Sequence, residues 1–187
     1  IELGDPMKDS TQMGPVISQA ALERCHRFIA TAHSEGGRQV AGTQALEMPS
    51  EFTKGYYIRP TVFADVRPDH QLFQEEVFGP VISITRFETD DQAIALANTG
   101  DFGLGVSIWS RDIARAHRLS RHIRGGIIWL NDHHRNDPRS VWGGVKDSGF
   151  GKENGWDALR GYLSKKSVVI RTEPGYDDWF AGSNRYG

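Results

Sequence analysis

The stretch from Pro80 to Leu130 alternates β-rich runs with helix-forming runs, and this alternation constrains the fold more than any other feature of the sequence. The β-rich runs are dominated by branched and aromatic residues, and the runs between them have apolar residues at helical spacing. Strands that alternate with helices of this length form right-handed β-α-β crossovers. We therefore predict an α/β fold with a largely parallel sheet flanked by helices. The predicted strands are 81–87, 104–109 and 127–130, and the predicted helices are 90–98 and 112–123.

The flanking sequence predicts further elements. In the helix expected at 18–36, Leu22, Cys25, Ile29 and Ala32 share one face, and the glycine pair that follows ends it. In the helix at 90–98, Thr89 is the expected cap, with Ile94 and Ala97 facing inward. The remaining expectations are strands at 38–41, 61–66 and 167–171, a long glycine-rich loop at 131–155 and a short helix at 156–162.

Length and composition favour one soluble globular domain. The chain has 187 residues, 22 basic and 24 acidic side chains, and a formal net charge of -2. This balance gives no indication of nucleic acid or an anionic membrane as a partner. No apolar run approaches the roughly 18 residues that cross a bilayer, and residues 1–5 lack the pattern of a secretory signal. With a single cysteine, we expect a cytoplasmic protein.

Three sequence blocks together resemble the C-terminal part of the aldehyde dehydrogenase superfamily. They are GYYIRPTVF at 55–63, EEVFGPVISI at 75–84 and GGVKDSGFGKE at 143–153. The resemblance extends from about Gly4 to about Val169. It implies that residues 1–166 form the rear part of a catalytic domain and that 167–187 form an oligomerisation strand and tail. It also implies that the nucleophilic cysteine, the general base and the dinucleotide-binding half precede Ile1.

The resemblance implies NAD(P)-dependent oxidation of an aldehyde to a carboxylic acid. An upstream thiolate would add to the aldehyde, hydride would pass to the nicotinamide, and water would hydrolyse the thioester. It assigns Glu76 to the hydroxyls of the nicotinamide ribose and Phe78 to the nicotinamide itself, with NAD or NADP as cofactor. The alternative reading of these two residues is a solvated acid and a core ring. We expect the isolated chain to be inactive; the competing hypothesis is a non-catalytic binding or assembly module that retains the fold.

The loop from Asn131 to Gly144 matches the family segment that lines the aldehyde tunnel. Family members commonly have Pro-Phe before the glycine pair, whereas this chain has Val141 and Trp142. The predicted substrate-binding residues are His134, Arg135, Asn136, Arg139 and Trp142. The indole would stack on a ring and the arginines would bind a carboxylate, which favours ring-bearing aldehydes or semialdehydes. Two alternatives are a metal site at His133, His134 and Asp137 and a plain solvated loop.

Several conspicuous residues are given structural rather than catalytic roles. Cys25 lies in line with Leu22 and Ile29 and is read as a packing residue. His26 points away from it by about 100°, so it is a poor base for the thiol. The glycines after Trp142 do not match a dinucleotide-binding fingerprint. Lys146 and Lys152 are read either as tunnel-rim charges or, more simply, as solvated lysines.

The segment Ser167–Arg171 is predicted to be a strand that pairs with a second subunit, giving a homo-oligomer. It is β-branched, too short to close a sheet alone, and flanked by basic residues that suit an edge. The family uses its C-terminal strand in this way. Four aromatic residues of the tail would lie beside the interface: Tyr176, Trp179, Phe180 and Tyr186. The alternative is a strand packed within its own subunit and a loose tail.

Overall fold

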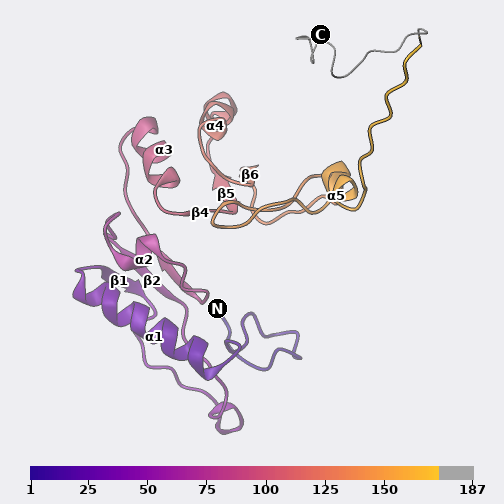
Figure 1. The fold of residues 1–187 in the computed structure, drawn as a ribbon. Coiled ribbons are helices and arrows are strands. Elements are labelled where there is room, and N and C mark those ends of the chain that lie inside the picture. The colour runs from indigo at the N-terminus through magenta and orange to yellow at the C-terminus, as the bar shows by residue number, and fades with distance from the viewer. Residues whose placement is uncertain (173–187) are drawn as a thin grey trace, which may run out of the picture.

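The computed structural model describes residues 1–172, in which α1, Gln19–Ser34, is the first helix (Figure 1). The Ser18 hydroxyl caps it by accepting from the amide of Ala21 at 3.2 Å. Gly36 ends it in the left-handed region, with a φ of +89°. The buried face consists of Ala21, Cys25, Phe28 and Ala32. The predicted helix is therefore confirmed, although Leu22 and Ile29 pack at the margin of the core rather than inside it.

Beside α1 lies a small mixed sheet. Strand β1, Arg38–Ala41, is antiparallel to β2, Thr61–Ala64, which in turn is parallel to β3, Val81–Ser83. A 3₁₀ helix, Ser50–Phe52, and α2, Gln71–Gln74, lie in the connections. The core between α1 and the sheet includes Cys25, Phe28, Phe63, Val66 and Val77. This core fixes the chain that leads into β3.

A second group of elements follows β3. Helix α3, Asp90–Asn98, begins at Thr89, whose hydroxyl accepts from the amide of Gln92 at 3.2 Å. Strand β5, Gly105–Ile108, then α4, Ile113–Ser120, and then β6, Ile127–Leu130, form a β-α-β unit in which the two strands are parallel. Its core holds Ile108, Ala116 and Leu119, with Ile94 packed against it. Ala97, predicted to face inward, is exposed.

The prediction of one largely parallel sheet is not confirmed. In residues 1–172 the strands form three separate sheets. Strand β4, Phe102–Gly103, pairs antiparallel with β7, Val145–Lys146, and does not join the sheet of β5 and β6. The two parallel pairs, β2 with β3 and β5 with β6, lie in different sheets. Apolar patterning identifies a strand but not the neighbour beside which it lies, so much of the error concerns pairing. Strands β4 and β7 were not predicted, and β3 ends at Ser83 rather than at 87.

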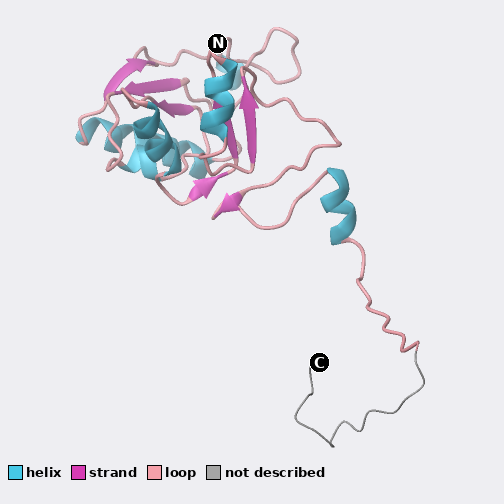
Figure 2. Ribbon diagram, turned by 90° about the horizontal axis from the view of Figure 1, so that it is seen from above, coloured by secondary structure: helices cyan, strands magenta, loops and turns pink. Residues whose placement is uncertain are grey.

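An arm extends from the body of the molecule and carries α5, Gly155–Gly161 (Figures 1 and 2). Residues 164–172 run onward from it as an extended, exposed segment. No strand is found at 167–171, since a strand needs a partner to complete its hydrogen bonds. The tail with Tyr176, Trp179, Phe180 and Tyr186 lies outside the described residues. Within residues 1–172, no helix has the length and apolar character needed to span a membrane.

Candidate active site

The loop 75–80, between α2 and β3, presents Glu76 and Phe78. Its start is fixed because the amide of Glu75 donates to the Gln71 carbonyl at 2.9 Å. Its centre is fixed by Val77, which is buried in the first core. A Cβ at Gly79 would collide with Sγ of Cys25, so only glycine allows the loop to lie this close to α1. The loop is thus held from beneath, with its charged and aromatic side chains outward.

The two carboxylates of the loop have different surroundings. The Gln71 amide donates to both Glu75 oxygens at 3.1 Å. In residues 1–172, no hydrogen bond or ion pair engages the carboxylate of Glu76, which is exposed. Glu76 is therefore the carboxylate available to accept hydrogen bonds from a ligand.

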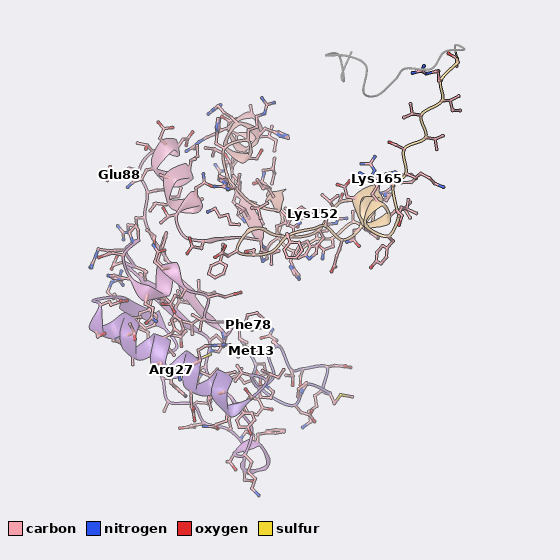
Figure 3. All side chains as sticks on the ribbon, viewed as in Figure 1. Met13, Arg27, Phe78, Glu88, Lys152 and Lys165 are labelled. Carbon is pink, nitrogen blue, oxygen red and sulfur yellow. The ribbon has the colours of Figure 1, made fainter. Side chains whose placement is uncertain are left out.

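Phe78 is exposed at the margin of the first group of elements (Figure 3). Its φ of +53° is unusual for an aromatic residue and turns the ring out of the core, leaving it 72% exposed. The guanidinium of Arg24 lies 6.0 Å from the ring centroid, within range of a cation–π contact. The reading of Phe78 as a core ring is therefore wrong.

A cleft of about 510 Å³ opens beside the loop. One side is formed by Glu75, Glu76 and Phe78, and the other by the segment around β4 and by Ser148. The Ser148 hydroxyl accepts from the amide of Gly103 at 2.9 Å, which joins β4 to the loop after β7. The two residues predicted to bind the cofactor, Glu76 and Phe78, both line this cleft, whereas the opposite wall was not predicted.

Four rings gather where β6 meets the long loop, and we call Trp129, His133, His134 and Trp142 the aromatic cluster. The Trp142 centroid lies 6.0 Å from that of Trp129 and 6.2 Å from that of His134, the latter edge-on. The indole N–H of Trp129 donates to the Arg135 carbonyl at 2.8 Å. Two of the predicted substrate residues, His134 and Trp142, are thus neighbours in a site with aromatic faces.

The other predicted loop residues are placed differently. Arg139 binds the Asp137 carboxylate through two nitrogens, at 3.2 and 3.0 Å, and thereby holds the pKa of Asp137 below its ordinary value. Arg135 and Asn136 are exposed, and Arg135 contributes its carbonyl rather than its guanidinium to the cluster. The loop is consequently better equipped with rings than with unpaired cations.

Trp129 and Gly105 are members of this region that sequence reasoning missed. Trp129 is buried at the end of a strand, where its pattern is that of a core residue. Gly105 lines the cleft, and a Cβ there would lie 2.8 Å from the Trp129 ring. An isolated glycine at the start of a predicted strand was the available signal of such a close approach. Gly105 therefore lies between the cleft and the aromatic cluster.

Cys25 is confirmed as a packing residue. It is fully buried beneath the 75–80 loop. Burial raises the pKa of the Cys25 thiol, and the nearby Arg24 offsets this only in part. Because the thiolate is the nucleophilic form, this thiol is unsuited to attack an aldehyde.

The two lysines of the 143–153 block are partly buried and hydrogen-bonded to the main chain. Lys146 Nζ donates to the carbonyls of Asn98 and Gly100 at 2.7 and 2.9 Å. Lys152 Nζ donates to the carbonyls of Gly143 and Gly144 at 2.8 and 2.7 Å. The reading of both as solvated lysines is therefore wrong, because each ammonium group bridges main-chain carbonyls, and the tunnel-rim reading stays a prediction.

The alternative metal site lacks support. No three His, Cys, Asp or Glu side chains within residues 1–172 gather closely enough to hold a metal ion. His133 instead shares a hydrogen bond of 2.8 Å between its Nδ1 and the Ser107 hydroxyl.

Comparison with known proteins agrees with this geometry. A betaine aldehyde dehydrogenase of Cereibacter sphaeroides is 44% identical over 174 residues, which are 93% of this chain and 35% of that protein. An aminoaldehyde dehydrogenase of Arabidopsis thaliana is 39% identical over 184 residues, 98% of this chain and 36% of that protein. The chain thus spans about a third of the length of these relatives.

A solved structure has the same fold. The crystal structure of betaine aldehyde dehydrogenase from Staphylococcus aureus in complex with NAD+ matches with a TM-score of 0.89 and 35% identity, over 97% of this chain and 36% of that one. The model of the aldehyde dehydrogenase family matches residues 1–168. The chain therefore belongs to the aldehyde dehydrogenase family.

Proposed function

We propose that this chain supplies the nicotinamide-ribose contacts and part of the aldehyde site of an NAD(P)-dependent aldehyde dehydrogenase. The observation that carries the proposal is the unpaired Glu76 carboxylate beside an exposed Phe78, at a cleft that Gly105 links to the aromatic cluster. The nucleophile and general base would come from the rest of the enzyme, because the one cysteine of this chain is buried.

The residues at the cleft fit a nicotinamide nucleotide. Glu76 is an acceptor-only group, suited to two ribose hydroxyl donors. Phe78 offers an exposed ring face to a planar heterocycle. The crystallised relative from Staphylococcus aureus holds NAD+. When bound, the nicotinamide would accept the hydride, and this chain would orient it.

For the substrate we propose an aldehyde that carries a cationic amino or quaternary ammonium group. The relatives are named for betaine aldehyde and aminoaldehydes. Trp129 and Trp142 offer indole faces, on which cations bind favourably. A carboxylated substrate ranks lower than it did from the sequence, because Arg139 is paired with Asp137 and, of the two predicted arginines, Arg135 alone has a guanidinium group that is unpaired within residues 1–172. A ring-bearing aldehyde is the second choice, through stacking.

The experiment uses the full-length enzyme in which we propose that this segment resides. Rates of oxidation of betaine aldehyde, an aminoaldehyde, benzaldehyde, succinic semialdehyde and acetaldehyde are measured with NAD and with NADP. We expect a cationic aldehyde to have the highest kcat/KM and the isolated 187-residue chain to show no oxidation. Acetaldehyde as the best substrate of the panel would contradict the proposed substrate class.

Glu76→Gln in the same enzyme tests the cofactor role. The amide accepts more weakly, and losing a hydrogen bond to a charged group costs about 1.5–3 kcal/mol, or roughly 10- to 100-fold in kcat/KM for the cofactor. Glu75→Gln is the matched control, with a smaller expected effect because Gln71 already binds Glu75. Equal cofactor kinetics in wild type and Glu76→Gln would remove Glu76 from the site.

A further inference from the structure

Lys152 holds the main chain directly after Trp142, in the loop between β7 and α5 (Figure 3). Its ammonium group binds two successive carbonyls, those of Gly143 and Gly144, and both bonds are partly buried. We infer that Lys152 is a positioning residue that sets where the Trp142 indole lies in the aldehyde site. Its consequence for catalysis rests on the proposed function.

We call the two bonds from Lys152 to the carbonyls of Gly143 and Gly144 the Lys152 clamp. A main-chain bridge adds to this clamp. The amide of Trp142 donates to the Glu153 carbonyl at 2.8 Å, and the amide of Glu153 donates to the Trp142 carbonyl at 2.7 Å. Lys152 and Glu153 together therefore bind the chain at Trp142, Gly143 and Gly144. The main chain at Trp142 cannot move without breaking one of these bonds.

Glycines bring the clamped segment close to its neighbours. Gly143 has a φ of +146°, and a Cβ there would meet the carbonyl of Gly151 and the Lys152 side chain at 3.0 and 3.2 Å. A Cβ at Gly126 would collide with the Gly143 carbonyl from the other side. Neighbouring main chain and the Lys152 side chain thus approach this segment closely, and no larger residue fits at either position without displacing them.

The clamp acts on the movable member of the aromatic cluster. Trp129 is buried in the body of the protein, with its indole N–H bonded to the Arg135 carbonyl. Trp142 is only partly buried, and its position depends on the loop that carries it. Removing the clamp should therefore change the spacing of the two indoles, 6.0 Å between centroids, while Trp129 stays in place.

Lys146 provides a matched control within the same block. It too donates to two carbonyls, but these belong to Asn98 and Gly100 at the end of α3. Lys146→Met and Lys152→Met therefore remove the same type of interaction at two places. Only the carbonyls bound by Lys152 directly follow Trp142 in the chain.

The test is a double-mutant cycle in the full-length enzyme. We expect Lys152→Met to raise KM for the best aldehyde about tenfold, with the KM for the cofactor changed less than about twofold. Lys152→Arg, which keeps charged donors, should restore most of the affinity. In a Trp142→Ala background, Lys152→Met should have less than about a twofold further effect, because the ring it positions is gone. A full tenfold effect in that background would overturn the inference, as would an equal loss in Lys146→Met.

A second measurement separates this inference from the proposed function. In the 15N-labelled 187-residue chain, the indole N–H resonance of Trp142 is assigned with Trp142→Phe. Lys152→Met should shift this resonance and Lys146→Met should not. An unmoved resonance contradicts the positioning role, whereas a moved resonance combined with a full-length enzyme that oxidises no aldehyde contradicts the proposed function alone. If Lys152→Met does not fold, Lys152→Gln serves in both experiments.

Discussion

The contact between Gly79 and Cys25 determines how close the 75–80 loop lies to α1. The sulfur occupies the place that a side chain at position 79 would need. Cys25 is therefore more than a core filler, because it supports the turn that carries Glu76 and Phe78. Its smallness and the missing side chain at position 79 are two halves of one packing arrangement.

Gly79→Ala should destabilise the 187-residue chain by about 1–3 kcal/mol, through overpacking against Cys25. Urea unfolding measures this cost. In a Cys25→Ala background the same change should cost much less, because the sulfur that collides is absent. Gly161→Ala is the control and should be nearly neutral, since no atom lies within 4 Å of a Cβ there. An equal cost of Gly79→Ala in both backgrounds would contradict the packing account.

Single residues were predictable where their role is local or where the family resemblance assigns it. The packing role of Cys25 is confirmed by its burial, whereas the site roles of Glu76, Phe78 and Trp142 stay predictions. The sequence did not indicate the two lysine clamps, since each depends on a loop folding back onto the ammonium group. Trp129 was missed because a tryptophan at the end of an apolar strand has the same pattern whether or not it adjoins a site.

Helices α3 and α4 are linked by an acidic residue between two arginines. Asp90 at the start of α3 accepts from Arg115 Nε at 2.8 Å, and Arg118 lies 3.6 Å from its other oxygen. The hydrogen bond from Arg115 is the main cause that lowers the pKa of Asp90 below its ordinary value. These side chains are partly exposed, so salt weakens the interaction.

This ion pair should contribute to stability at neutral pH and lose its effect in acid. Because the folded state lowers the pKa of Asp90, the contribution is present above the unfolded pKa of about 3.9 and is lost as pH falls through the lower, folded value. Asp90→Asn should therefore have a lower Tm than wild type at pH 7, and the difference should shrink near pH 2. Asp91→Asn, on the same helical turn, is the control and should change Tm less. A Tm difference that is constant across this range would contradict the assignment.

The bounds of elements were more predictable than the pairing of strands. The expected helix 90–98 has the observed bounds, and the strands 38–41 and 127–130 also match. Capping residues and helical periodicity are local, so they can be read from adjacent residues. Strand pairing is not local: β4 joins β7 across more than forty residues, and nothing in the sequence of β4 specifies that partner.

The extended segment 164–172 leaves apolar side chains unprotected. Val168, Val169 and Ile170 are 75%, 93% and 75% exposed, and Tyr162 is 90% exposed in the arm before them. A monomer rarely exposes so many neighbouring apolar side chains. We retain the proposal that Ser167–Arg171 pairs with a second subunit, where main-chain hydrogen bonds would complete a strand.

Two truncations bracket that segment. A chain that ends at Lys165 should form an assembly of fewer subunits than a chain that ends at Thr172, because only the longer chain keeps the proposed pairing strand. Light scattering coupled to size-exclusion chromatography gives the masses. An equal number of subunits in the two assemblies would contradict pairing through this segment. A mass that falls only when residues 173–187 are removed would assign assembly to the tail instead.

The two hydrophobic cores also bear on the order of synthesis. The first core and its margin draw on residues from Val16 to Val81, and the second on residues from Ile94 to Leu130. Each is completed by one continuous stretch of chain, so the first can collapse while the second is still in the ribosome. The cleft lies where the two meet, and its walls therefore come together only after both units have formed. Vectorial folding of this kind would leave the 75–80 loop in place before the opposite wall exists.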